Sequence, residues 1–298
     1  MQFNLLENKI TFPFLNFFTF PTLNSKFLDL DDFTIIDYFN GYEHAKKGIV
    51  KFVGHAEQRI KEDYLRILRY FRFLARMTPE NAQPYHDAET MDTIKSLRSG
   101  LDRISNERKW MELNKILAHP KHGDTVLDLM LRNCDLKNQI CLEKLENQAV
   151  EDYLKKMSNI YKLQKSVFST LHELNRFTNL HPLPALTFLY PLADKDQITK
   201  VARDLKMSNI ERQTCELSWQ YRELFQSEQI DFYQIQKLCF RLSRAIPNVK
   251  NKLIYTMIAV KSTEKPDLNI VKLIEDSNLD TWEVPKLPLD GNYLMENL

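Results

Sequence analysis

Glycine is scarce in this sequence, with 6 residues among 298. Sheets, barrels and phosphate-cradling loops use glycine freely, because the backbone there turns sharply or approaches a ligand closely. No Gly-rich phosphate loop occurs anywhere in the chain. The low count therefore favours a mostly helical protein.

Long apolar runs and metal-type cysteine spacings are also absent. No stretch of about 18 uninterrupted apolar residues is present, which argues against a membrane span. Residues 10–23 are Phe-rich with two prolines and make a poor signal or transit peptide, so we do not expect a secreted protein. The four cysteines lack ligand spacing, and we expect them to be reduced, buried thiols of an intracellular protein: Cys134, Cys141, Cys215 and Cys239.

Charge is balanced along the whole chain but not locally. The net charge is +1, so the average gives no indication of a nucleic-acid partner. Between Ala45 and Arg76, however, nine basic residues face three acidic ones, a local charge of +6. An excess of that size is an electrostatic footprint for a polyanion, although most basic helices are only solvated faces.

Hydrophobic periodicity predicts a small β-hairpin followed by helices. Phe33–Tyr38 and Ile49–Val53, around the turn Asn40–Gly41, are predicted to pair, with further partner strands upstream. Prolines are expected to interrupt the helical pattern at 120, 182, 184, 191 and 247, and order should decline past Lys261. The predicted helices are 57–77, 87–98, 105–118, 123–132, 150–175, 185–205, 208–227, 232–243 and 248–261.

The segment 59–76, RIKEDYLRILRYFRFLAR, carries the strongest functional signal. Apolar residues at steps of three and four form one buried stripe, and Asp63, Arg66 and Arg69 recur at steps of three on another face. A carboxylate acceptor beside a guanidinium fork suits a nucleobase edge with a phosphate nearby. The alternative is an ordinary surface ion pair between Asp63 and Arg66, worth about 0.2–0.5 kcal/mol.

Several motifs in order resemble those of the class II tRNA nucleotidyltransferases, the CCA-adding enzymes of the poly(A) polymerase-like family. Thr22–Ser25 (TLNS) resembles the segment that follows the family's RRD motif, and residues 37–43 (DYFNGYE) resemble its palm edge. The stretch 53–56 (VGHA) and the RIKEDYLRILRYFRF that follows resemble the family's EDxxR motif and its flanks. Later matches are SNER at 105–108 with Glu112 and KIL at 115–117, and WEVP at 282–285.

The resemblance stops abruptly at its N-terminal end. The family opens with a Gly-rich GGxVRD segment, an Asp-x-Asp pair that binds two metal ions, and the RRD motif. Here Phe18–Thr19–Phe20 stands where RRD is expected, and Asp29, Asp31 and Asp32 follow the TLNS segment instead of preceding it. These aspartates are better explained as a turn between strands. We expect an N-terminally truncated member that stops within the tail, with an exposed sheet edge and apolar surface where the palm is missing.

The resemblance implies roles for individual residues. Asp63 and Arg66 correspond to the pair that selects the incoming base, Glu62 is expected to orient Arg66 or a neighbouring arginine, and Arg69 to reach a triphosphate or brace Asp63. Arg108 and Glu112 are expected to stabilise the neck. Asp37, Tyr38 and Gly41 either form a turn at the head edge or contact nucleotide. No catalytic and no metal-ligating residue is expected in this chain.

The resemblance also implies a fold and a function. We expect a mostly α chain divided into a non-homologous segment 1–21, a head remnant 22–56, a neck 57–118, a helical body 119–262 and a partial tail 263–298. It would act in CCA addition to tRNA, with CTP and ATP as substrates, and would bind the acceptor stem and elbow of the tRNA. Magnesium is the cofactor of intact family members. The compartment would be mitochondrial, cytoplasmic or nuclear, with no membrane and no DNA partner. Because the metal-binding and RRD motifs are missing, we expect the chain to be inactive by itself. The alternatives are a non-catalytic tRNA-binding or regulatory protein and a structural helical adaptor.

Overall fold

The computed structural model describes most of the helical part of the chain. The described residues are 26–28, 33–119, 121–142, 148, 150–155, 157–160, 182–187, 195–227, 230–261, 269–279, 281–283 and 285. Three predicted parts lie outside the described residues: the segment 1–21, the second part of the predicted helix 150–175 from Tyr161 onward, and the end of the tail. The expected α class is confirmed, since helices make up nearly all the regular structure.

The elements follow one another as a short hairpin and a succession of helices. The N-terminal elements are β1 (Lys26–Leu28), β2 (Ile35–Asp37), α1 (Gly41–Lys46), α2 (Ala56–Glu62), α3 (Arg66–Met77), α4 (Ala88–Leu97), the 3₁₀ helix η3 (Arg98–Arg103), α5 (Asn106–Leu117) and α6 (Gly123–Arg132). The C-terminal elements are α9 (Pro182–Leu186), α10 (Lys195–Asp204), α11 (Asn209–Tyr221), η6 (Arg222–Phe225), α12 (Phe232–Leu242), α13 (Val249–Lys261) and α14 (Asn269–Asp276).

The hairpin differs from the predicted one in its partner strand. β2 pairs antiparallel with β1, with Phe27 opposite Ile36, and not with the run at 49–53. Asn40 adopts a left-handed conformation (φ 54°) and precedes the first turn of α1, so Asn40–Gly41 starts a helix and is not a hairpin turn. The short side chain of Asn tolerates that conformation, which explains why a turn signal and a helix start look alike in the sequence.

Two further predictions about helices were wrong. Pro182 and Pro184 stand inside α9 and do not interrupt it, because the first turn of a helix leaves its N–H groups unpaired and proline has none to lose. Past Lys261 the described residues include one further helix, α14, which packs through Ile270 and Ile274, both fully buried, while 262–268 lies outside them. The helix predicted over 185–205 coincides with α10 only in its second half, and 188–194 lies outside the described residues.

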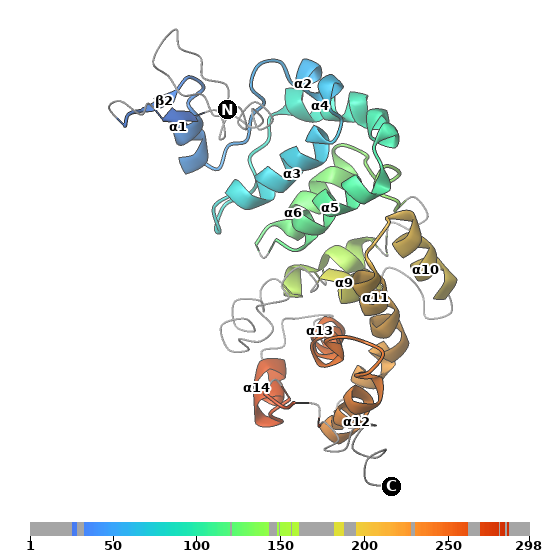
Figure 1. Cartoon of the computed structure of the whole chain (residues 1–298). Coiled ribbons are helices and arrows are strands. Elements are labelled where there is room, and N and C mark those ends of the chain that lie inside the picture. The colour runs from blue at the N-terminus through green and yellow to red at the C-terminus, as the bar shows by residue number, and fades with distance from the viewer. Residues whose placement is uncertain are drawn as a thin grey trace, which may run out of the picture.

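The helices line up as an elongated body in Figure 1, with β2 and α1 at one end and α12 and α14 toward the other. α3, α5 and α6 pack against one another, and α9, α11 and α13 form a second packed group. The exposed aromatic and aliphatic side chains of the first end include Phe33, Ile35, Tyr38 and Tyr42, which are 58–71% exposed. This is the apolar surface that the sequence predicts at the head edge.

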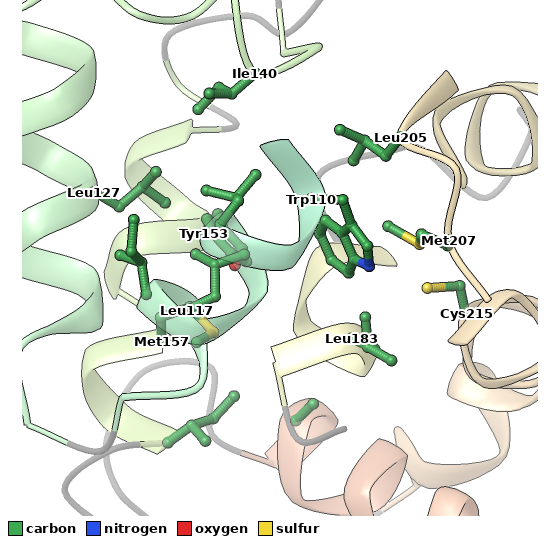
Figure 2. Close-up of a cluster of buried hydrophobic side chains, with 14 of the residues drawn as sticks. Trp110, Leu117, Leu127, Ile140, Tyr153, Met157, Leu183, Leu205, Met207 and Cys215 are labelled. Carbon is green, nitrogen blue, oxygen red and sulfur yellow. The ribbon is translucent and has the colours of Figure 1, made fainter. Parts of the chain in front are cut away.

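One buried cluster joins the two helical groups. Figure 2 shows Trp110 of α5 lying between Leu117 and Tyr153 on one side and Met207 and Cys215 on the other. The cluster encloses an apolar cavity of about 30 Å³, room for one water molecule at most. This void is therefore a packing defect and not a ligand site.

A single carboxylate fixes the angle between α5 and α11. Glu211 Oε1 accepts hydrogen bonds from Trp110 Nε1 and from Asn114 Nδ2, both at 3.0 Å. Its other oxygen accepts from the backbone N–H of Ser208 at 2.7 Å and completes a capping box at the start of α11. The Glu211 side chain thus caps α11 and also hydrogen-bonds α11 to α5.

The cysteines are free thiols. Cys134, Cys215 and Cys239 are buried and Cys141 is half-buried, as the sequence predicts. Burial raises the pKa of Cys134 and Cys215 to about 12 and that of Cys239 to about 11, so these thiols stay protonated and unreactive at neutral pH. Among the described residues, no helix is both long and apolar enough to cross a membrane.

His119, which follows α5, makes the stability of the fold depend on pH. Burial, the neighbouring His122 and the cations Lys121 and Arg76 lower its pKa from 6.5 to about 4. Because the unfolded chain takes up this proton at a higher pH, the free energy of unfolding should fall as the pH drops from about 6.5 toward 4. The partly exposed ring limits the expected loss to on the order of 1–2 kcal/mol.

Urea denaturation at pH 7 and at pH 5 measures this loss, since pH 5 lies above the range in which most carboxylates titrate. The variant His119→Gln should lose the difference that His119 contributes between these two pH values. His55→Gln, which removes an exposed imidazole, is the matched control and should keep it. Equal pH dependence in both variants would contradict the assignment.

Candidate nucleotide-binding site

The expected helix over 57–77 is broken at the residues that carry the strongest functional signal. α2 ends at Glu62, Asp63 is extended (φ −153°, ψ 105°), and α3 starts at Arg66. Asp63 Oδ1 accepts from the backbone N–H of Leu65 at 3.1 Å, and its carbonyl accepts from Arg66 N–H at 3.0 Å. Aspartate favours such helix starts because its short carboxylate reaches the unpaired N–H groups. Asp63 is therefore not on one helical face with Arg66 and Arg69.

Across the break, one carboxylate binds two arginines. Glu62 Oε2 accepts from Arg66 Nη1 at 2.6 Å and from Arg59 Nη1 at 2.8 Å. Arg66 Nη1 also donates to the carbonyl of Arg59 at 2.9 Å, one of the carbonyls that the last turn of α2 leaves without a helical partner. The hydrogen bond from Arg66 holds the pKa of Glu62 below its ordinary value. Glu62 thus fixes the position of the Arg66 guanidinium.

Helix α5 supports the break from the other side. Arg108 Nη2 lies 3.5 Å from Asp63 Oδ2, so the predicted ion pair between Asp63 and Arg66 is replaced by one between Asp63 and Arg108. The carboxylate of Glu112 is buried, with 7% of its side chain exposed, and lies 2.9 Å from Arg72 Nη1 and 3.9 Å from Arg69 Nε. Arg69 therefore contacts Glu112 and does not brace Asp63.

These contacts leave free hydrogen-bonding capacity on both Arg66 and Asp63. In the described part of the chain both contacts of Arg66 use Nη1, so Nη2 and Nε remain for a ligand. Asp63 keeps 27% of its side chain exposed, and each of its oxygens has a further lone pair. The pair can therefore meet one edge of a planar ring that offers both a donor and an acceptor.

A cleft of about 880 Å³ opens beside Glu62. It lies between residues 51–58, α2 and the start of α4, and that volume is typical of small-molecule sites. Its charged lining is mixed, and two acidic groups are already engaged: Glu57 pairs with Lys61 at 2.6 Å, and Asp87 caps α4. The cleft has room for a planar ring, and its lining includes Glu62 but neither Asp63 nor Arg66.

The turn at the head edge is built by Asp37. Its two carboxylate oxygens accept from the backbone N–H groups of Gly41 at 2.8 Å and Tyr42 at 2.7 Å, at the start of α1. Tyr38 stands exposed beside it at 64%. The geometry supports the turn-forming role of Asp37 and Gly41, and a nucleotide role for these residues stays a prediction.

Two arginines make contacts in the structure to which the motif assigns no role. Arg59 shares Glu62 with Arg66, and Arg72 is the strongest partner of Glu112. Burial lowers the pKa of Arg72 and the nearby Glu112 opposes that shift. The spacing of Arg59 and Glu62 by three residues was a visible signal, whereas the contact of Arg72 with a residue 40 positions away was not.

Metal binding finds no support in the described residues. No three His, Cys, Asp or Glu side chains converge in that part of the chain. Asp29, Asp31 and Asp32 lie outside it, so their expected role as a turn stays a prediction.

Comparisons with known proteins point to one family. A family model described as the probable RNA and SrmB-binding site of polymerase A matches residues 87–140, which include α4, η3, α5 and α6. The CCA tRNA nucleotidyltransferase 1, mitochondrial, of Homo sapiens is 45% identical over 139 residues, which are 47% of this chain and 30% of that protein. The chain thus matches less than a third of the length of that relative.

Solved structures show the same fold over nearly the whole chain. A Bacillus stearothermophilus CCA-adding enzyme in complex with CTP aligns with a TM-score of 0.60 and 18% identity, covering 93% of this chain and 62% of that one. A Thermotoga maritima CCA-adding enzyme complexed with tRNA aligns with a TM-score of 0.55 and 19% identity, covering 93% of this chain and 63% of that one. At these identities the likeness establishes the fold.

Packing against Gly100 of η3 should control the helix break. A Cβ added to Gly100 would lie 1.9 Å from Tyr64 Cδ1 and 2.0 Å from Cε1, inside the ring of the residue between Asp63 and Leu65. Gly100→Ala must therefore displace Tyr64, and we expect a loss of about 1–3 kcal/mol in the free energy of unfolding. Urea denaturation measures it. Ser99→Ala, an exposed neighbour, is the control, and equal midpoints for the two variants would refute this packing role.

Proposed function

The chain belongs to the family of CCA-adding enzymes and poly(A) polymerases, and from this premise we propose that it carries the base-selecting and tRNA-binding part of a CCA tRNA nucleotidyltransferase. The observation that supports the proposal most is the helix break at Asp63–Leu65, where Asp63 and Arg66 are each held by a separate neighbour. The nucleotides selected would be CTP and ATP.

The chemistry of the two side chains favours these bases. Cytosine and adenine each present an amino donor beside a ring-nitrogen acceptor, whereas uracil and guanine reverse the order. Asp63 can accept from the amino group while Arg66 donates to the ring nitrogen. Each such charged contact is worth roughly 1–3 kcal/mol, because the wrong base faces an unpaired charge.

Fixed positions make this selection effective. Glu62 and the Arg59 carbonyl hold the Arg66 guanidinium from behind, and Arg108 and the Leu65 N–H hold Asp63. Side chains held in advance lose little conformational entropy when a base arrives. Arg69 and Arg72, on the same helix as Arg66, would lie toward the phosphates, with Glu112 limiting their motion.

The RNA partner we propose is tRNA, contacted at its acceptor stem and elbow through shape and phosphate charge. The local charge of +6 at 45–76 and the family match over 87–140 support this partner. The matched relative's name suggests a mitochondrial compartment, and we extend that proposal to this chain.

Magnesium serves nucleotidyl transfer by activating the primer hydroxyl and neutralising the leaving pyrophosphate. The described residues do not fit such a site, because no cluster of carboxylates or imidazoles among them converges. The sequence also has no GGxVRD segment and no RRD motif. We therefore propose that this chain selects and binds but does not transfer nucleotide by itself.

Changing Asp63 should weaken base discrimination. We expect CTP and ATP to bind at least roughly tenfold more tightly than UTP and GTP, as one well-made base contact permits. Asp63→Asn offers a donor as well as an acceptor and should reduce the difference to a few-fold. Arg66→Lys keeps the charge but loses the fork and should weaken CTP and ATP binding. Equilibrium dialysis with each nucleotide measures both effects.

The matched control for Asp63→Asn is Asp128→Asn, which neutralises a partly exposed carboxylate of α6 that pairs with Arg132. It should leave discrimination unchanged, and circular dichroism should show the same helix content in all variants. If Asp63→Asn keeps the tenfold preference, Asp63 does not select the base.

Extension of tRNA tests the rest of the proposal. The chain, supplied with CTP, ATP, magnesium and a tRNA lacking its 3′ end, should bind the tRNA in a salt-dependent manner and add no nucleotide. Filter binding and a labelled-nucleotide gel measure the two properties separately. Addition of cytidine by the chain alone would overturn the proposed lack of transfer, and salt-insensitive binding would favour a structural adaptor.

A further inference from the structure

Two arginines share the carboxylate of Glu62, but they share it unequally. Glu62 Oε2 accepts from Arg59 Nη1 at 2.8 Å and from Arg66 Nη1 at 2.6 Å. Oε1 accepts from Arg59 Nη1 at 3.1 Å. In the described part of the chain, Arg59 thus contacts both oxygens of the carboxylate, whereas Arg66 contacts one of them.

The single contact of Arg66 differs from the geometry that arginine–carboxylate pairs favour. Such pairs frequently form two parallel hydrogen bonds, because the planar fork of the guanidinium matches the two oxygens of a carboxylate. With Nη1 bonded to Oε2, the second bond would join Arg66 Nη2 to Oε1, the oxygen that Arg59 contacts. That bond would use a nitrogen that the base-selecting site needs.

The backbone of Arg59 contacts Arg66 as well, and this contact does not depend on the Arg59 side chain. Arg66 Nη1 donates to the Arg59 carbonyl at 2.9 Å. The side chains of Arg59 and Arg66 are 21% and 15% exposed, so both guanidinium groups are largely shielded from water and attract Glu62 more strongly than on an open surface. Replacing the Arg59 side chain therefore keeps the carbonyl contact and changes the occupancy of Oε1.

The charges of this group favour a donor at the base. The hydrogen bond from Arg66 and the charge of Arg59 hold the pKa of Glu62 below its ordinary value, so the carboxylate is ionised at neutral pH. Two guanidinium groups and one carboxylate leave a surplus of one positive charge. If Arg66 closed on Glu62 by itself, its charge would be compensated within the pair, and its fork would no longer face a ring nitrogen.

We propose that Arg59 is a positioning residue for base selection: by binding Glu62 Oε1, it prevents Arg66 from closing both ends of its fork on that carboxylate. Arg66 then keeps Nη2 and Nε for the ring nitrogen of cytosine or adenine. The inference rests on the proposed function, because it explains how Arg66 remains a donor there. Arg59 acts through Glu62 and touches neither the base nor the phosphates.

Nucleotide binding by Arg59→Gln tests this role. Without the Arg59 charge, Arg66 should bind both oxygens of Glu62, and the affinity for CTP and ATP should fall roughly tenfold, to the level of UTP and GTP. UTP and GTP should bind as before, whereas a general loss of structure would weaken all four nucleotides alike. Arg59→Lys keeps a cation at Oε1 and should retain most of the preference. Equilibrium dialysis with each nucleotide measures these affinities.

The matched control is Arg132→Gln, which removes an arginine of a comparable ion pair, four residues from Asp128 on α6. It changes the net charge equally and should leave all four affinities as in the unchanged chain. If Arg59→Gln keeps the preference for CTP and ATP, as this control does, Arg59 has no positioning role.

A double-mutant cycle shows whether Arg59 acts through Glu62. Glu62→Gln should weaken CTP binding roughly several-fold, because Arg66 loses its charged partner. Adding Arg59→Gln to Glu62→Gln should weaken CTP binding no further, since no carboxylate remains on which Arg66 can close. Losses that multiply in the double variant would show that Arg59 contacts the nucleotide directly, and this result would overturn the proposal.

A crystal structure of the Arg59→Gln variant without nucleotide separates this proposal from the proposed function. It should show Arg66 bonded to both Oε1 and Oε2 of Glu62, whatever the chain binds. A single bond between these side chains would overturn the role of Arg59, even where the unchanged chain prefers CTP and ATP. Two bonds would support that role, and a missing base preference in the unchanged chain would then contradict the proposed function instead.

Discussion

The buried carboxylate of Glu112 holds the arginine-rich helix α3 against α5. With 7% of its side chain exposed, it lies 2.9 Å from Arg72 and 3.9 Å from Arg69 and from Lys115. A buried carboxylate without such partners would be strongly destabilising, and the three cations around Glu112, two from α3 and one from α5, would repel one another without it. The positions of Arg66 and Asp63 follow from this contact, because α5 also supplies Arg108.

Helix α5 also contacts α11, through a second set of side chains. Trp110 packs in the cluster shown in Figure 2, and its indole N–H and the Asn114 amide bind Glu211 at the start of α11. A displacement of α11 would therefore reach Asp63 through one rigid helix.

How far the sequence predicts this molecule depends on the range of the interactions. The buried positions of α3 and the bounds of α5 and α6 depend on neighbours within four residues, so periodicity predicts them well. The break at Asp63 was missed because Tyr64 packs on Gly100, a contact that no local pattern shows. Likewise β2 pairs with β1 and not with the run at 49–53, although β1 has no β-branched residue and that run has three, so local propensity does not choose the partner.

In the candidate site, too, local interactions were predictable from the sequence and long-range interactions were not. The identities of Asp63, Arg66 and Glu62 came from the motif, whereas their partners came from distant helices. Local spacing suggested that Asp63 and Arg66 would pair with each other, but two arginines compete for two carboxylates and the nearest geometry wins: Glu62 binds Arg66, and Arg108 binds Asp63. This separation has a chemical consequence. A bonded Asp63–Arg66 pair would satisfy itself, whereas here the two side chains bind separate partners and each keeps hydrogen-bonding capacity of its own.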